Sequence, residues 1–307
     1  MRGIVLHRYG GPDDLREEEL PDPRVAPGEI LIRVRAAGVN PVDWKIGAGA
    51  LDALMEVRFP LVPGWDVSGV VESVGLDVRE FEPGDEVLGY LRKDWAQTGT
   101  YAELVSAHVR LVARKPPSLG WAEAAGLPLA GLTALQALRR ARVESGDTVL
   151  VHAAAGGVGS LGAQLAVLRG ARVIGTASPR NHDFLRDLGA EPVEYGDGLE
   201  ERVRTLAPHG VDAALDFVGE DTCSVSASLV HDAERIVSIA DPGVSEVGGS
   251  YLWVRPDADD LAELARLAAE DRLTVPIEHT LPLSSAAEAW RHSAAGRTRG
   301  KIVLTVS

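Results

Sequence analysis

A run of small residues near the middle of the chain most restricts the folds open to it. Residues 152–162 read HAAAGGVGSLG and include no Asp, Glu, Lys or Arg. The apolar stretch 147–153 predicts a β-strand, and residues 160–169 predict a helix opened by small residues. The glycines therefore lie on a turn between a strand and a helix that begins at about Gly157.

The spacing within this turn indicates what it binds. Written as G-x-G-x-x-G, the pattern has alanine in the first glycine position and glycine in the other two. Residues without a large side chain let a pyrophosphate approach the backbone, while the helix start offers unpaired N–H groups and the positive end of its dipole. A tight structural turn is the alternative that the pattern alone leaves open. The expected phosphate contacts are Ala154, Gly156, Gly157, Val158 and Gly159.

Composition narrows the class of protein. The chain has 307 residues, 45% hydrophobic and 25% charged, which predicts a globular protein of about two domains. A net charge of −14 argues against a nucleic-acid partner. The uncharged stretch 148–168 is long enough to span a membrane, but His152, Gln164 and the glycines within it argue against a membrane protein. Cys223 is the single cysteine, and the N-terminus has no apolar signal core, so we expect a cytoplasmic protein without disulfides.

The first part of the chain, to about Ser118, is rich in short strands separated by turns. Strands are predicted at residues 30–35, 67–74 and 85–89, and together they indicate a compact β-barrel. After Pro276 the chain returns to short strands and a small helix, and we expect its last strand, 301–306, to pack back on this first domain.

From Trp121 onward, helices and strands alternate. This alternation predicts an α/β domain with a parallel, doubly wound sheet. The predicted helices are 121–142, the helix after the glycine turn and 258–270. The predicted strands are 148–153, 172–176, 211–217, 234–239 and 250–254.

Six motifs then occur in an order that resembles one known family. They are residues 40–45 (NPVDWK), 63–66 (PGWD), 83–87 (PGDEV), 131–134 (GLTA), 146–164 around the glycine turn, and 299–304 (RGKIVL). This order resembles the medium-chain dehydrogenase/reductases and, within them, the zinc-free quinone oxidoreductase branch. One departure concerns the subfamily: Val167 stands where the quinone oxidoreductase signature expects Lys, Arg or Ser.

The resemblance implies a Rossmann doubly wound parallel sheet plus a GroES-like β-barrel domain, with the active site in the cleft between them. We expect a GroES-like substrate and catalytic domain at 1–118, completed by 275–307, and a Rossmann NADP-binding domain at 119–274. Zinc-dependent relatives carry cysteine where Asn40 stands and Gly-His-Glu where residues 64–66 stand. Because tetrahedral zinc needs such ligands to converge, we expect no zinc.

The end of the second Rossmann strand bears on the choice of cofactor. Ser178 follows this strand and Arg180 comes two residues later, whereas an NAD enzyme would place Asp or Glu near there. A small hydroxyl followed by arginine suits a 2′-phosphate and favours NADP(H), with NAD and a solvated, helix-capping Arg180 as the alternative. Asn181 is expected to contact the same phosphate, and Tyr195 to lie over the adenine side.

Further cofactor contacts are expected from the resemblance and from position. Thr133 matches a threonine near the nicotinamide, with a simple helix kink as the alternative. Val218 and Ile239 fall at carboxyl ends of strands, where ligands bind in such sheets. Arg299 and Lys301 match a motif that reaches the cofactor in relatives, and ordinary surface bases on a terminal strand are the alternative.

NADPH can give a hydride to a carbonyl, an activated alkene or a quinone. Without a zinc Lewis acid, quinones and conjugated enones are favoured, since they delocalise the developing negative charge. Asn40 is the expected hydrogen-bond donor or substrate positioner, and Tyr90 the expected proton donor if it faces the cleft. Asp43 and Lys45 are expected mainly to hold the local turn and barrel by hydrogen bonds or an ion pair, with direct catalytic involvement as the alternative.

The tryptophans are candidates for stacking on a flat substrate. Trp44, Trp65 and Trp253 are the expected substrate contacts, and packing is the alternative for Trp65 and Trp253. We expect His152 to be a buried structural histidine.

Three functions stay open at this point. The leading hypothesis is an NADPH-dependent quinone reductase. The second is an enoyl or alkenal reductase, including one for a polyketide-like substrate, and the third is an NADPH-binding structural or sensor protein with little turnover. We also expect a homodimer, formed by pairing of the edge strand 249–254 with its copy.

Overall fold

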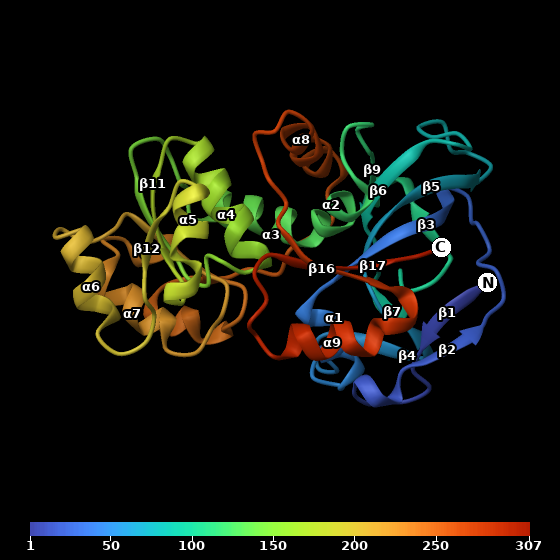
Figure 1. Cartoon of the computed structure of the whole chain (residues 1–307), viewed down its shortest axis with the longest axis horizontal. Coiled ribbons are helices and arrows are strands. Elements are labelled where there is room, and N and C mark those ends of the chain that lie inside the picture. Colours follow the sequence, from blue (N-terminus) through green and yellow to red (C-terminus); the bar gives the residue numbers. More distant parts are fainter. The chain divides into compact units, whose positions relative to one another are not determined.

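The computed structural model describes residues 1–307 and divides into two compact units (Figure 1). The first unit comprises Met1–Leu132 and Pro256–Ser307, and the second comprises Thr133–Arg255. These limits differ from the domain limits 118 and 275 expected from sequence. The first unit is larger because helix α2 (Trp121–Gly126) packs on strand β3 and helix α8 (Ala258–Ala269) packs beside strand β9.

The main sheet of the first unit has seven strands. The strand order is β16-β17-β3-β5-β6-β9, and β8 also pairs with β3. The strands are β3 (Glu29–Val39), β5 (Asp66–Val74), β6 (Glu86–Tyr90), β8 (Leu104–His108), β9 (Val112–Arg114), β16 (Ile277–Pro282) and β17 (Lys301–Thr305). As predicted, the last strand packs back on the first part of the chain, since β17 pairs antiparallel with β3.

Strand β3 shows why this sheet forms and how it reaches the site. Its first half alternates buried Ile30 and Ile32 with exposed Arg33, the period-two pattern of a strand with one buried face. Its second half is fully buried, because β17 and β5 pair with its two edges and α2 covers it. Helix α2 rests directly on the strand: a Cβ on Gly38 would lie 2.3 Å from the carbonyl oxygen of Ala125.

Smaller elements complete the first unit. Two-stranded sheets form between β1 (Arg2–Val5) and β2 (Arg16–Glu19), and between β4 (Glu56–Val62) and β7 (Trp95–Thr98). Helix α1 (Pro41–Gly47) follows β3 directly and packs on α9 (Ala286–Ala294), whose Trp290 is fully buried. Gly47 provides the space for this packing, since a Cβ there would lie 2.6 Å from the Trp290 ring.

The second unit contains a six-stranded, fully parallel sheet. Its order is β12-β11-β10-β13-β14-β15. Successive strands are therefore added outward from β10, first toward one edge of the sheet and then toward the other, as in a doubly wound fold. The strands are β10 (Thr148–Val151), β11 (Arg172–Thr176), β12 (Glu191–Val193), β13 (Ala213–Asp216), β14 (Ile236–Ser238) and β15 (Ser250–Tyr251). The helices are α3 (Pro128–Arg140), which begins in the first unit, then α4 (Gly157–Leu168), α5 (His182–Asp187), α6 (Leu199–Leu206) and α7 (Thr222–Leu229).

Three expectations about these elements are corrected. The single helix expected at 121–142 is two helices, α2 and α3, separated at Leu127. Pro128 begins α3, and its ring nitrogen cannot continue the hydrogen bonds of α2. Strand β10 ends at Val151, so His152 lies after the strand and not inside it. The edge strand β15 has only two residues, not the span 249–254.

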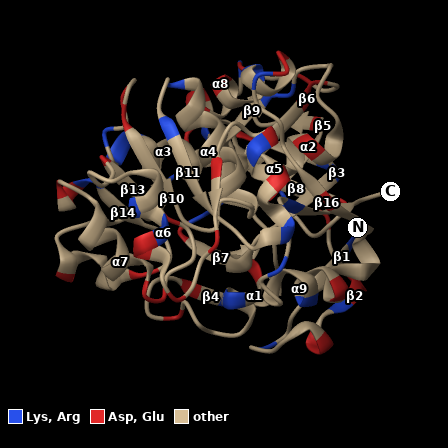
Figure 2. Cartoon of the chain, turned by 60° about the vertical axis from the view of Figure 1, so that its left-hand side comes forward, with Lys and Arg blue, Asp and Glu red and all other residues tan.

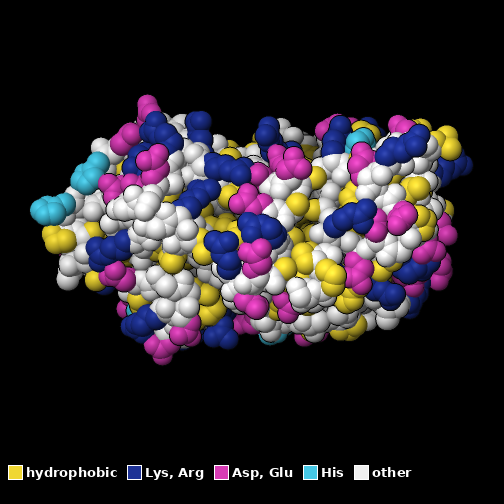
Figure 3. All heavy atoms as spheres, turned by 90° about the horizontal axis from the view of Figure 1, so that it is seen from above, with side chains coloured by type: hydrophobic (Ala, Val, Ile, Leu, Met, Phe, Trp, Pro, Cys, Tyr) yellow, Lys and Arg dark blue, Asp and Glu magenta, His cyan; other side chains and the backbone are white.

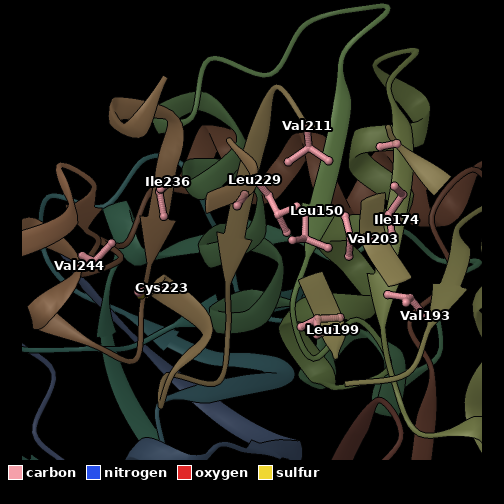
Figure 4. Packing of buried hydrophobic residues seen from close by; sticks show 12 residues of the cluster. Leu150, Ile174, Val193, Leu199, Val203, Val211, Cys223, Leu229, Ile236 and Val244 are labelled. Carbon is pink, nitrogen blue, oxygen red and sulfur yellow. The ribbon is translucent and has the colours of Figure 1, made fainter. Parts of the chain in front are cut away.

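The core of the second unit lies between its sheet and the helices that follow the strands (Figure 4). Leu150 and Ile174 from adjacent strands are buried together with Leu199 and Val203 of α6 and Leu229 of α7. This apolar layer fixes the strands in register and so fixes the loops at their carboxyl ends.

The surface carries both signs of charge. Basic and acidic residues are interspersed along the ribbon in Figure 2. On the face drawn in Figure 3 their side chains are likewise interspersed, with hydrophobic side chains scattered between them. No helix of the chain combines the length and the apolar character needed to cross a bilayer.

Candidate active site

The glycine-rich turn joins β10 to α4 and is fastened to the neighbouring strand β11. The N–H of Ala153 donates to the hydroxyl of Thr176 at 3.0 Å, and the N–H of Ala154 donates to the carbonyl of Thr176 at 3.0 Å. The turn closes on itself, since the N–H of Gly156 donates to the carbonyl of Ala153 at 2.9 Å. Ala153 adopts φ 52°, the left-handed region that a non-glycine residue seldom occupies.

Helix α4 begins at Gly157, as the sequence predicts. The N–H groups of its first turn, from Gly157, Val158 and Gly159, have no acceptor within the helix. Gly159 permits the tight approach of helix and turn, since a Cβ there would lie 2.2 Å from the carbonyl oxygen of Ala153. The turn thus offers backbone donors at a helix start without a side chain in front of them, which fits a pyrophosphate.

The loop after β11 carries the residues expected to choose the cofactor. Ser178 is half-buried, Arg180 is exposed, and both belong to the short turn that follows the strand. The side-chain amide of Asn181 donates to the Ser178 hydroxyl at 3.4 Å. Because β10 and β11 are adjacent and parallel, the carboxyl ends of both strands lie at one edge of the sheet. The structure therefore brings the glycine turn and residues 178–181 together.

Tyr195 lies in the loop after β12, next along the same edge, and is 60% exposed. Arg202 of α6 holds this loop: its guanidinium donates to the carbonyl of Glu194 at 3.0 Å and to that of Asp197 at 2.8 Å. Sequence reasoning missed Arg202, because nothing in its local pattern distinguishes it from other surface arginines.

Asp216 is a second residue that sequence reasoning missed. It is fully buried at the end of β13, and its carboxylate accepts from the N–H groups of Val218 (3.0 Å) and Gly219 (2.9 Å) and from the Ser238 hydroxyl (2.5 Å). The N–H of Ile239 donates to its carbonyl at 3.1 Å. Burial alone would raise the pKa of Asp216, but these hydrogen bonds hold it below its ordinary value. The sequence contains one sign of this role, a single acidic residue at the end of an apolar predicted strand.

Asp216 therefore positions the two loops that carry Val218 and Ile239, which were expected to line the cofactor site. Val218 is 46% exposed. Contact of Val218 and Ile239 with a cofactor stays a prediction.

His152 is a structural residue, as expected. It is fully buried and its Nε2 lies 2.9 Å from the hydroxyl of Ser226 on α7. Burial lowers the pKa of His152 to about 4, so the imidazole is neutral at neutral pH.

In the first unit, the motifs near both ends of the chain meet in a buried polar cluster. Asn40, at the start of α1, donates from its side-chain nitrogen to the carboxylate of Asp66 at 2.9 Å. The ammonium of Lys301, on β17, donates to the side-chain oxygen of Asn40 and to the carbonyl of Val39 (3.1 Å). It also lies 4.0 Å from the Asp66 carboxylate. We call Asn40, Asp43, Asp66 and Lys301 the buried cluster.

Asp43 is the fourth member of the buried cluster. One oxygen of its carboxyl group, Oδ2, accepts from the backbone N–H of Asn40 at 2.8 Å and from the hydroxyl of Tyr101 at 2.9 Å. The other oxygen, Oδ1, is buried and has no hydrogen-bond partner. Asp43 also completes the capping box at the start of α1, which is the turn-holding role expected from sequence.

Burial dominates the electrostatics of the buried cluster. It raises the pKa of Asp43 to about 7 and that of Asp66 to about 6, and Lys301 limits the rise at Asp66. Burial also lowers the pKa of Lys301 itself, although both carboxyl groups oppose this.

This geometry bears on what was expected of Asn40 and Lys301. Both polar atoms of the Asn40 side chain make hydrogen bonds inside the buried cluster, which use one of its two amide N–H groups, so donation from Asn40 to a substrate stays a prediction. Lys301 is buried, so the surface-base alternative is wrong. Its ammonium is directed to protein atoms, and its contact with a cofactor stays a prediction.

Arg299 and Thr133 also remain predicted cofactor contacts. Arg299 is exposed, and its backbone N–H donates to the carboxylate of Glu278 at 2.8 Å. Thr133 is buried on α3.

A pocket in the first unit adjoins the buried cluster. It is lined by Asp43, Ile46, residues 61–65, Leu91, Lys93 and residues 95–99. Trp65 and Trp95 are the two aromatic residues in its lining. The Lys93 ammonium donates to the Thr98 hydroxyl at 2.9 Å, and burial lowers its pKa.

The other expected substrate contacts lie elsewhere. The indole N–H of Trp44 donates to the Ser293 hydroxyl on α9 at 3.2 Å, so Trp44 packs between two helices and does not line the pocket. Trp253 belongs to the second unit and is 37% exposed.

Tyr90 is disfavoured as a proton donor. It is only 1% exposed, and its ring packs edge-on to Trp65 with centroids 6.0 Å apart. Burial raises the pKa of Tyr90 well above its ordinary value, so loss of its proton would leave a poorly solvated phenolate.

The side chains present do not fit a catalytic zinc ion. No three His, Cys, Asp or Glu side chains are grouped so that they could hold a metal. At the positions where zinc-dependent relatives carry ligands, Asn40 and Asp66 are already engaged with each other and with the Lys301 ammonium. A second cation beside this ammonium would be repelled.

Comparison with known proteins identifies the family of the chain. Residues 26–117 match the alcohol dehydrogenase GroES-like domain, and residues 188–304 match the domain described as zinc-binding dehydrogenase. The chloroplast envelope quinone oxidoreductase homolog of Arabidopsis thaliana is 33% identical, over 99% of this chain and 98% of the relative. The NADPH-dependent alkenal/one oxidoreductase of the same plant is 32% identical, over 99% of this chain and 79% of the relative. Among solved structures, the quinone oxidoreductase from Coxiella burnetii has a TM-score of 0.90 and 36% identity, over 100% of this chain and 99% of that chain.

A GroES-like unit joined to a doubly wound parallel sheet with a glycine-rich turn defines the medium-chain dehydrogenase/reductase fold. The chain belongs to the quinone oxidoreductase-like family of this superfamily and is an oxidoreductase.

Proposed function

We propose that the protein reduces quinones with NADPH and works without zinc. The observation that carries the proposal is the common sheet edge shared by the glycine turn and by Ser178, Arg180 and Asn181. The quinone oxidoreductase names of the Arabidopsis and Coxiella relatives support quinones as the acceptor class.

The residues on this edge fit NADPH. The N–H groups of Gly157, Val158 and Gly159 would hold the pyrophosphate. The residues that would hold the 2′-phosphate are Ser178, Arg180 and Asn181. Tyr195 would cover the adenine, and Thr133 would lie near the nicotinamide. Further cofactor contacts would come from Val218, Ile239, Arg299 and Lys301. When bound, NADPH supplies the hydride.

The chain's own residues would perform the remaining tasks. Trp65 and Trp95, which line the pocket, would contact a flat acceptor, and the apolar residues Leu61 and Leu91 beside them would exclude water. The buried cluster would keep fixed charges beside this pocket in a region of low dielectric constant, where they act strongly.

A conjugated enone or alkenal is the second candidate acceptor. It needs the same cofactor geometry, and the alkenal/one oxidoreductase name of one relative favours it. A protein that binds NADPH for a structural or sensing purpose is the third candidate.

Steady-state turnover separates these functions. Oxidation of NADPH is followed by absorbance with 1,4-benzoquinone, 9,10-phenanthrenequinone and a small enone in parallel. We expect turnover with the quinones. Preference for the enone would assign an enone reductase, and tight NADPH binding without any turnover would favour the binding protein.

Arg180→Ala is expected to raise the dissociation constant of NADPH about tenfold to hundredfold, because one charge-assisted hydrogen bond contributes about 1.5–3 kcal/mol. The dissociation constant of NADH should not change, since NADH has no 2′-phosphate. Both constants can be measured by titration calorimetry. Arg186→Ala is the matched control, because this exposed arginine of α5 pairs with Asp183. Equal losses for NADPH and NADH would contradict the assignment of Arg180.

We also propose a homodimer in the cytoplasm. The edge position of β15 supports pairing with a second copy, although this strand is short. A monomeric mass by light scattering would refute the dimer, and cell fractionation tests the location.

A further inference from the structure

The unpartnered oxygen of Asp43 calls for an explanation. A buried carboxylate oxygen without a donor costs about 1–3 kcal/mol or more, whereas its partner oxygen Oδ2 accepts two hydrogen bonds. A proton on Oδ1 lowers this cost, because the buried group is then a neutral carboxyl group and not a carboxylate.

The charges around Asp43 favour the same state. The buried cluster contains two carboxyl groups, Asp43 and Asp66, but only one ammonium, that of Lys301. Asp66 is the better place for the negative charge, since it accepts from Asn40 and from the backbone N–H of Leu129 (2.9 Å) and lies 4.0 Å from Lys301. A proton on Asp43 makes the buried cluster neutral, in agreement with a pKa of Asp43 raised by burial to about 7.

The other titratable groups near Asp43 do not compete for this role. The hydroxyl of Tyr101 is directed to Oδ2 of Asp43, and Tyr90 is buried and neutral. Lys93 lies in the wall of the same pocket, where it donates to Thr98. Asp43 is thus the one acidic side chain among the residues that line the pocket.

We propose that Asp43, as a neutral carboxylic acid, is the proton donor to the reduced acceptor at the pocket that Trp65 and Trp95 line. This inference rests on the proposed function. Reduction of a conjugated carbonyl compound by hydride leaves an oxyanion. The O–H bond of Asp43 breaks, its electron pair stays on the carboxylate, and a new O–H bond forms on the product, so nothing is oxidised or reduced in this step. The backbone N–H of Asn40 and the hydroxyl of Tyr101 stabilise the resulting carboxylate until solvent returns the proton.

Asp43→Asn separates this role from the capping of α1. Asparagine keeps an oxygen that accepts from Asn40 and Tyr101, and it has an amide N–H in place of the acid O–H, but it has no proton to transfer. We expect kcat to fall about 100-fold, as for loss of a general acid, with the NADPH dissociation constant unchanged. The wild-type kcat should decrease as the pH rises through about 7, and the variant should lose this dependence. Asp257→Asn is the control, since Asp257 caps α8 by accepting from the N–H of Asp260 at 3.1 Å.

A second measurement does not depend on turnover. Infrared difference spectra of wild type against Asp43→Asn should contain the C=O stretching band of a buried, protonated carboxyl group at about pH 6 and lose it at about pH 8. A wild type without this band at the lower pH overturns the inference even if the enzyme turns over.

The kinetic outcomes are equally decisive. An Asp43→Asn enzyme with the wild-type kcat, or a loss of turnover in Lys93→Met but not in Asp43→Asn, overturns the inference. If none of the tested acceptors causes the wild-type protein to oxidise NADPH, the proposed function is refuted, and the donor role of Asp43 is refuted with it. The infrared band then still reports separately whether Asp43 holds a proton.

Discussion

Replacing Lys301 by methionine is expected to lower the free energy of unfolding by about 3–5 kcal/mol, the range for removing one partner of a buried charge pair. Methionine fills a similar volume but carries no charge. The change leaves the Asp66 carboxylate without its cation and leaves the side-chain oxygen of Asn40 without a donor.

The loss of stability should also depend on pH. Burial raises the folded-state pKa of Asp43 to about 7 and that of Asp66 to about 6, so the folded protein binds more protons than the unfolded chain above about pH 4. The contribution of these two carboxyl groups to the free energy of unfolding is therefore fully present at low pH and is lost as the pH rises through their folded-state pKa values. Without Lys301 both carboxyl groups hold their protons more tightly, so the variant should be destabilised more at about pH 8 than at about pH 5.

Urea denaturation of both proteins at the two pH values checks this prediction. Lys45→Met is the control, because Lys45 is exposed on α1 and its ammonium lies 5.7 Å from the Trp44 ring. A Lys301→Met protein as stable as the wild type at the higher pH would show that the ammonium does not neutralise the buried cluster.

Gly159→Ala is expected to weaken NADPH binding by more than about 100-fold, equivalent to about 2.7 kcal/mol or more. A Cβ at this position would lie 2.2 Å from the carbonyl oxygen of Ala153 and 2.7 Å from the Cα of Ala154. Both atoms belong to backbone, so the turn and the start of α4 must separate. The unpaired N–H groups then no longer converge on one phosphate.

The sign of the stability change makes this test stringent. In an unhindered helix, alanine is favoured over glycine by about 1 kcal/mol, so a variant without a clash would be more stable than the wild type. We expect a less stable one. Gly162→Ala, on the same helix, is the control, because its Cβ would meet only the edge of the Phe217 ring at 3.1 Å. Wild-type NADPH affinity in Gly159→Ala would contradict the phosphate-binding role of the turn.

Much of the second unit could be predicted because its signals are local. The glycine turn was located from a dozen consecutive residues, and β11 was predicted at 172–176, the residues it occupies. Two kinds of error arose where local patterns are ambiguous. The helix expected at 121–142 ignored the break before Pro128, and β12 was missed because three residues give too short a pattern.

The candidate site in the first unit was far less predictable. Tyr90 and Trp44 were chosen by residue type, and burial and the contact with Ser293 removed them from the expected roles. Asp43 was recognised as a turn-holding residue, but nothing in its neighbourhood indicated that one of its oxygens would be left without a donor.

The sequence by itself determined the class of fold and the position of the phosphate-binding turn, because backbone conformation and helix dipoles depend on residues that are adjacent in the chain. Only the tertiary structure decided the charge state of the site. Asn40 and Lys301 are separated by 261 residues and meet because β17 pairs with β3. A pKa depends on which charges and how little water surround a group, and both are set by residues that the fold brings together from distant parts of the chain.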